Sequence, residues 1–176
     1  MELDGILQVM HKRNDEVERR ENSLQGTIVP FMNNKEKIVF TIGYEKRDID
    51  DFVRILQINN VEILVDIRAN GHSRKPGFSN GTLKNRLESV GINYLHVAKL
   101  GIPKELRAHL KTKGYNWLFK EYEKRLNHDT NELKKLEKVV NRGTSCLMCF
   151  ELEPRECHRS ITAKKLEDNG FEIAHL

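Results

Sequence analysis

Residues 37–67 read KIVFTIGYEKRDIDDFVRILQINNVEILVDI, and this stretch decides the fold class. Two short runs of β-branched residues, 37–42 and 62–67, predict strands. The segment between them, 48–59, opens with acidic residues, as a helix N-terminus does, and predicts a helix. A strand, a helix and a second strand in succession imply a right-handed crossover between parallel strands. The stretch therefore predicts an α/β protein.

The same alternation continues to the end of the chain. The further expected elements are helix 79–90, strand 92–97, a helical stretch 103–140 broken near Gly114 and at 127–129, strand 145–149, helix 156–169 and strand 171–176. We therefore expect residues 37–176 to form a single three-layer α/β domain, with helices on both faces of a mostly parallel sheet.

Residues 1–36 differ from the rest of the chain. Apolar residues between Leu3 and Val17 are spaced mainly as one face of a helix, and Ser23 to Asn34 have the composition of a connector. We expect an N-terminal amphipathic helix that packs on the domain or forms part of a homodimer interface. A regulatory arm is the alternative.

Composition narrows the classes of function. The chain has 176 residues, no apolar run long enough to span a bilayer, and an odd number of cysteines, which is three. These features predict a cytoplasmic protein with reduced thiols, no membrane association and no cofactor. The net charge of +4 permits an anionic partner, a small molecule or a nucleotide, but falls short of a strong indication of nucleic-acid binding.

In open α/β sheets, ligands bind at the carboxyl ends of the strands. Polar residues gather after the predicted strands, and together they form a recognisable set of motifs. They are TIGY (41–44), VDIR (65–68) with Ser73, Arg74 and Phe78, YLH (94–96) with Leu100, Gly101 and Arg107, CFE (149–151), CHR (157–159) and the terminal His175 and Leu176. In this order the motifs resemble the prokaryotic family catalogued as domain of unknown function 488, over about residues 37–176. The chain departs from the family pattern at Tyr44, where the family has His or Ser, and at Ile102, where it often has Gly. The resemblance implies no reaction.

The cysteines are the strongest candidates for chemistry. Cys149 ends a predicted strand, and Cys157 opens the last long helix beside His158 and Arg159. A helix N-terminus stabilises a thiolate, so Cys149 and Cys157 are candidate nucleophiles, with His158 or His96 as the proton carrier. Buried cysteines that only fill space are the alternative, and we expect that role for Cys146 in the middle of its strand.

Metal binding and an anion-binding loop are two other uses of these residues. Cys149, Glu151, Cys157 and His158 offer metal ligands, but the Cys-x7-Cys spacing is irregular for zinc, so no metal ligand is predicted and a structural metal site remains an alternative. The Cys-x5-Arg spacing from Cys149 to Arg155 encloses two glutamates, which repel a phosphate, and is treated as coincidence.

A second set of residues suits an anionic substrate. Guanidinium groups bind phosphate or carboxylate through paired hydrogen bonds, and a hydroxyl or an aromatic ring adds to such a site. The expected substrate-binding residues are Tyr44, Asp66, Arg68, Ser73, Arg74, Phe78, Arg107, Glu151 and Arg159, with Tyr94 as a further ring. Ion pairs from the same arginines to Asp66, Glu45 and Glu151 are the structural alternative.

Three hypotheses follow. The first is a cysteine-dependent enzyme acting on a phosphate-like or nucleotide-like substrate. The second is a binding module that uses the same arginines for a nucleotide or nucleic acid, without chemistry. The third is a structural metal site. The enzyme is the leading hypothesis by a narrow margin.

Overall fold

Five parallel strands form the sheet in the computed structural model, which describes residues 37–176. The strands are β1 (Ile38–Gly43), β2 (Ile63–Asp66), β3 (Asn93–His96), β4 (Ser145–Cys149) and β5 (Glu172–His175). Their order across the sheet is β3-β2-β4-β1-β5, and every neighbouring pair is parallel. The predicted α/β fold with a parallel sheet is therefore confirmed. The helix expected within residues 1–36, and the dimer contact expected of it, lie outside the described residues.

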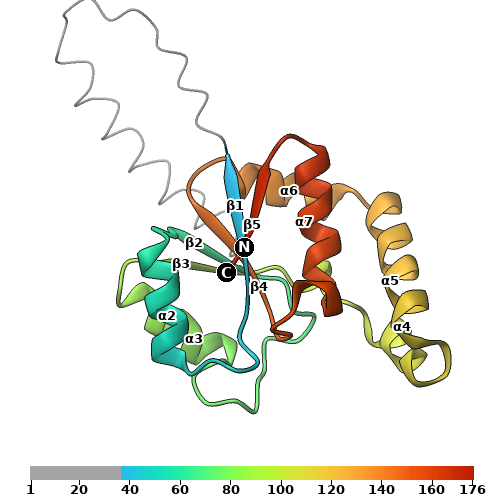
Figure 1. Cartoon of the computed structure of the whole chain (residues 1–176), viewed down its shortest axis with the longest axis horizontal. Helices are drawn as coiled ribbons and strands as arrows, with labels where there is room; N and C mark the ends of the chain where they lie inside the picture. The colour runs from blue at the N-terminus through green and yellow to red at the C-terminus, as the bar shows by residue number, and fades with distance from the viewer. Residues whose placement is uncertain (1–36) are drawn as a thin grey trace, which may run out of the picture. The chain divides into compact units, whose positions relative to one another are not determined.

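Two helices cover one face of the sheet, α2 (Ile49–Ile58) and α3 (Asn80–Glu88) (Figure 1). The carboxylate of Asp48 accepts a hydrogen bond from the Asp51 amide and caps the start of α2. The apolar side of α2 is buried through Phe52, Val53 and Leu56, and it belongs to the same core as Ile42 and Met148 of the sheet. Burial of this apolar face is what attaches the helix to the strands.

The other face is covered by α6 (Asn131–Val140) and α7 (Arg159–Asp168). Helix α5 (Leu110–His128) packs against α7 farther from the sheet, and the short helix α4 (Lys104–Ala108) precedes it (Figure 1). The helical stretch breaks where the sequence predicted. Gly114 has a φ of 75°, a left-handed conformation that glycine adopts without strain, and α6 starts anew at Asn131. Within residues 37–176, no helix is long and apolar enough to cross a membrane.

The order of the strands determines where a ligand site can form. Strands β1 and β2 lead into helices on the α2 and α3 face, whereas β4, which lies between them, leads into α7 on the opposite face. Neighbouring strands that send the chain to opposite faces leave a crevice at their carboxyl ends. The register sets Gly43 level with Cys149 and Asp66 level with Met148, so the ends of β1, β2 and β4 meet there.

Candidate functional site

Two thiols and an imidazole meet at the carboxyl end of β4. The ligand atoms of Cys149, Cys157 and His158 all lie within 4.8 Å of one another. The three residues are buried, with exposed fractions of 3%, 1% and 2%. The sequence placed these three residues at one sheet edge, and the structure brings their side chains together as one cluster, called the thiol cluster below.

The backbone around Cys157 differs from the expected helix over 156–169. A 3-10 turn, η2 (Pro154–Glu156), comes first, Cys157 is extended, and α7 begins only at Arg159. Proline has no N–H to donate, so it fits the first position of the short turn but not the interior of a longer helix. The Cys157 sulfur accepts a hydrogen bond from the Arg159 amide at 3.5 Å, which favours the thiolate.

The imidazole of His158 is held from two sides. Its Nε2 lies 3.1 Å from the carbonyl oxygen of Ile67, and a carbonyl only accepts, so Nε2 carries the proton. In the neutral ring the lone pair is then on Nδ1, which lies 3.7 Å from the Cys149 sulfur. The ring of Tyr122 packs edge-on against His158 with centroids 5.2 Å apart. His158 is therefore oriented to accept a proton, or to ligate a cation, on the side of Cys149.

Negative charge in the thiol cluster resides on Cys157. Burial by itself raises the pKa of Cys157, but hydrogen bonding from the Cys149 thiol and the other polar groups around it outweighs burial and lowers that pKa to about 3. The hydrogen bond to Cys157, together with burial, raises the pKa of Cys149 well above its ordinary value. Burial and the charge of Cys157 raise the pKa of Glu151, whose Oε2 lies 3.4 Å from the Cys149 sulfur. The cluster thus combines a thiolate with a neighbouring protonated thiol.

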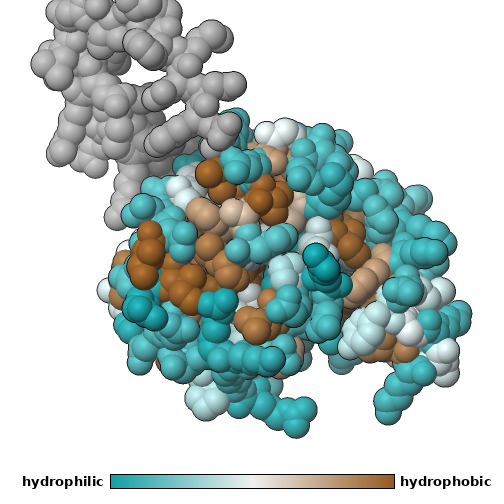
Figure 2. All heavy atoms as spheres, viewed as in Figure 1, coloured by the Kyte–Doolittle hydropathy of each residue, from teal (hydrophilic) through white to brown (hydrophobic). Residues whose placement is uncertain are grey.

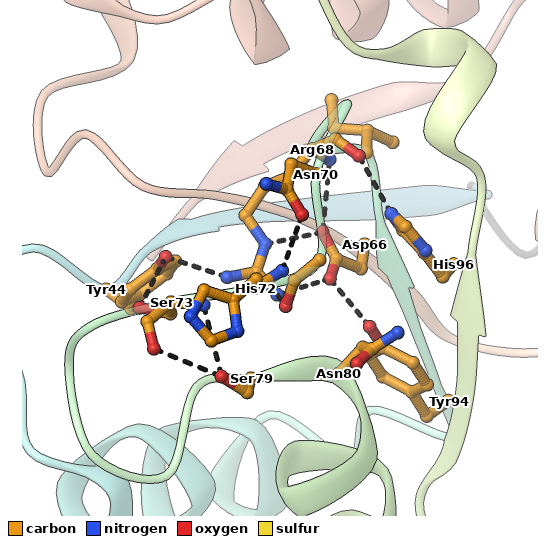
Figure 3. A network of polar contacts seen from close by, with 12 residues as sticks. Tyr44, Asp66, Arg68, Asn70, His72, Ser73, Ser79, Asn80, Tyr94 and His96 are labelled. Atoms are coloured by element: carbon orange, nitrogen blue, oxygen red, sulfur yellow. Dashed lines mark hydrogen bonds and ion pairs between the residues drawn. The ribbon is translucent and has the colours of Figure 1, made fainter.

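A second group of polar residues surrounds Asp66 and Arg68 (Figure 3). The carboxylate of Asp66 accepts hydrogen bonds from Arg68 Nε at 2.8 Å and Nη2 at 2.6 Å. It also accepts a hydrogen bond from the Tyr94 hydroxyl at 2.6 Å. Burial disfavours the charge on Arg68, but the hydrogen bonds and charge of Asp66 outweigh it and raise the pKa. His96 donates from Nε2 to the Arg68 carbonyl at 2.8 Å, so it belongs to this group and not to the thiol cluster.

The aromatic residues expected to stack on a base pack on one another. Tyr44 and Phe78 are buried and stack with ring centroids 4.3 Å apart. The Tyr44 hydroxyl accepts a hydrogen bond from Arg68 Nη1 at 2.7 Å and donates one to the Ser73 hydroxyl at 3.3 Å. Ser73 in turn accepts the amide of Lys75 and fixes the loop between β2 and α3. Tyr44, Phe78 and Ser73 thus have partners within the domain.

The arginines separate into buried and exposed pairs. Arg159 is fully buried and donates to the backbone carbonyls of Glu151 and Leu152, while Arg68 is engaged by Asp66. Arg74, on the loop after β2, and Arg107, on α4, are exposed. Arg68 forms the ion pair of the structural alternative, whereas Arg159 is held by backbone carbonyls. The exposed arginines at this edge of the sheet are Arg74, after β2, and Arg155, on η2 after β4.

Tyr122 and Gly43 shape the site, although the sequence analysis did not assign a role in it to either residue. The ring of Tyr122 packs on His158, and its hydroxyl donates to the Leu100 carbonyl and bonds the hydroxyl of Thr162. A side chain at Gly43 would collide with the Glu151 carbonyl, because an added Cβ would lie 1.9 Å from that oxygen. The glycine at the end of a predicted strand was a signal for such a close approach, whereas nothing in the sequence links Tyr122 to His158.

Comparison with known proteins places the chain in a family without assigning an activity. No curated protein and no solved structure matches it. A family model described as domain of unknown function DUF488 matches residues 48–166, about two thirds of the chain, and covers β2, β3, β4 and the thiol cluster. The chain therefore belongs to the DUF488 family.

Proposed function

We propose that the chain is a cysteine-dependent enzyme acting on an anionic substrate. The observation that carries the proposal is the convergence of Cys149, Cys157 and His158 within 4.8 Å, at the end of the strand where the chain crosses to the other face of the sheet. Nucleophilic catalysis requires a thiolate with a proton carrier in reach, and crevices at such points are the usual ligand sites of α/β sheets.

The division of roles follows from the charge distribution. Cys157 is the nucleophile, because its pKa is lowered to about 3 and it is a thiolate at neutral pH. Cys149 keeps its proton and lies 3.7 Å from the free lone pair of His158, so these two residues carry the proton to the leaving group. With 1% of Cys157 exposed, the reacting part of the substrate has to be small.

Arg74 is the residue proposed to bind the substrate anion. It is exposed and follows Ser73, which is bonded to Tyr44 at the carboxyl end of β1. Arg68 and Arg159 instead orient the loops of this edge through their internal bonds. A phosphate or carboxylate beside Arg74 gains a charge-assisted hydrogen bond without breaking the internal network.

The test is alkylation of the chelator-treated protein with iodoacetamide, followed at each cysteine by peptide mass. A thiol with an ordinary pKa of about 8.5 slows roughly 500-fold between about pH 8.5 and about pH 5.5. The alkylation rate of Cys157 should change less than about twofold over that range, because its pKa is about 3. Cys146, whose pKa is raised by burial and not lowered as that of Cys157 is, is the internal control and should stay unmodified over the same pH range. A Cys157 that is inert at every pH, or that reacts with ordinary pH dependence, contradicts the proposal.

A second measurement tests whether the substrate is anionic. Iodoacetate carries a carboxylate and iodoacetamide does not, so their rate ratio at Cys157 reports attraction of a negative reagent. We expect Arg74→Ala to lower this ratio, and Arg54→Ala, on the exposed side of α2, to leave it unchanged. Equal ratios in both variants and in the unmodified protein count against an anionic substrate.

A metal centre is the second candidate function, favoured by the ligand set itself. Cys149, Cys157 and His158 supply two sulfurs and one nitrogen, which suit zinc, and Glu151 lies beside them. The bond from His158 Nε2 to the Ile67 carbonyl is the kind of support that orients a metal-binding imidazole. Zinc that copurifies at about one ion per chain, is lost in Cys157→Ser and is kept in Cys146→Ser establishes the metal centre; its absence in the unmodified protein favours the enzyme.

A further inference from the structure

A strongly basic segment lies apart from the thiol cluster. Residues 104–120, which form α4 and the first half of α5, are called the basic arm here. The arm holds five lysine or arginine residues and one glutamate, so its net charge is +4, the same as that of the entire chain. Residues 37–176 hold 25 lysine or arginine residues and 19 aspartate or glutamate residues, so the arm supplies four of their six net positive charges.

The cations of the basic arm have no acidic partners within residues 37–176. They are Lys104, Arg107, Lys111, Lys113 and Lys120, and all five are exposed. Several exposed charges elsewhere are paired, as Lys124 is with Glu121 and Lys164 is with Glu167. Helix α4 has no buried residue and lies at the end of the domain, away from the sheet (Figure 1).

Aromatic rings lie among the same cations. Tyr115 is 57% exposed, a large fraction for such a ring. Trp117 is half-buried, with the Lys113 ammonium 4.4 Å from its centroid, and Phe119 lies 5.8 Å from Tyr115. In Figure 2 this end of the domain, at lower right, is mainly teal and white, which indicates hydrophilic and intermediate residues. The surface thus combines cations that have no acidic partner within residues 37–176 with one exposed ring, that of Tyr115.

We propose that the basic arm binds single-stranded nucleic acid. The phosphates pair with the five free cations, and an unstacked base stacks on Tyr115. A duplex keeps its bases stacked inside and leaves the exposed ring unused, so the aromatic residues favour a single strand. The inference is independent of the proposed enzyme, since it uses none of the residues of the thiol cluster.

The chain contains its own reporter for the test. Trp117 is the only tryptophan, and it lies on the arm. We expect oligothymidylate of about 20 nucleotides, a length that exceeds the arm, to change Trp117 fluorescence in a saturable way. Five neutralised phosphates predict a slope of about −3.5 in a plot of log affinity against log salt concentration, at roughly 0.7 per contact for single strands.

Substitutions separate the two parts of the interaction. Lys111→Gln together with Lys120→Gln should reduce the slope by about 1.4, because two phosphate contacts are lost. Tyr115→Ala should weaken binding at least about fivefold and leave the slope unchanged, because a stacking contact carries no charge. Lys84→Gln and Lys164→Gln change exposed lysines outside the arm and are the matched controls.

Three results would overturn the inference. The first is no saturable binding at low salt, measured both by Trp117 fluorescence and by anisotropy of a labelled oligonucleotide. The second is equal loss of affinity in the arm variants and in the controls, which indicates diffuse attraction. The third is equal affinity for a duplex of the same length. Thermal unfolding of each variant confirms that the fold is kept, since every substituted side chain is exposed.

Discussion

Two ion pairs with the same chemistry and different burial allow a sharp test of the structure. Asp66 and Arg68 are 2.6 Å apart with side-chain exposures of 0% and 7%, whereas Asp50 and Arg86 are 2.8 Å apart with 79% and 41%. The substitutions to compare are Asp66→Ala and Asp50→Ala. Each removes one carboxylate from an arginine, and only the first leaves the guanidinium buried.

The expected losses of stability differ several-fold. Removal of one partner of a buried pair costs about 3–5 kcal/mol, because an uncompensated charge remains inside the protein. In a domain of this size that loss lowers the Tm by roughly 10–20 °C. Breaking an exposed pair costs less than about 1 kcal/mol. Asp66→Ala also leaves the Tyr94 hydroxyl without its acceptor, which adds to the loss.

Urea and thermal unfolding of the two variants measure both losses. A double variant, Asp66→Leu with Arg68→Met, should recover part of the stability lost in Asp66→Ala, because neither charge remains. Equal losses in Asp66→Ala and Asp50→Ala would refute the burial of this pair. A double variant less stable than Asp66→Ala would show that the cost does not come from the unpaired guanidinium.

Further predictions concern packing and pH. Gly43→Ala should destabilise the domain strongly in urea unfolding, because the new methyl group meets the Glu151 carbonyl, while Gly81→Ala in an open part of α3 should stabilise it by up to about 1 kcal/mol. Tyr122→Phe should cost about 1–3 kcal/mol in the same assay by removing a buried hydroxyl from its two partners, and no loss would contradict that bonding. Burial, aided by the charge of Arg159, lowers the pKa of His175 below its ordinary value, so the unfolded chain binds the proton more readily. Stability should therefore fall as the pH drops below about 6.5, and His175→Gln should flatten that dependence in unfolding curves measured at several pH values.

The elements of the fold were predictable because each has a local cause. The fourth strand was expected at 145–149 and is Ser145–Cys149, since a short apolar run without helical period suits a buried parallel strand. The break at Gly114 was expected from the residue type, and its φ of 75° confirms it. The start of α7 was misplaced, because the 3-10 turn at Pro154 reads in sequence like the first turn of a helix.

The sequence by itself also determined that chemistry-bearing residues gather at one edge, because parallel strands all end on the same side of a sheet. It did not determine which of them meet. The position of β4 between β1 and β2 depends on tertiary packing. This position sets Cys149 level with Gly43, and the Cys149 sulfur lies within reach of His158.

The roles of Arg74 and Arg159 were decided only by the tertiary structure, whereas the ion pair of Arg68 with Asp66 lies within one motif and was expected as the structural alternative. Arg68, Arg74 and Arg159 look equivalent in sequence, as guanidinium groups near strand ends. In the fold, Arg68 meets Asp66 and Arg159 meets two backbone carbonyls, while Arg74 remains exposed. A guanidinium binds whichever acceptors lie within about 3 Å, and those acceptors are assembled by packing between segments that sequence patterns do not connect.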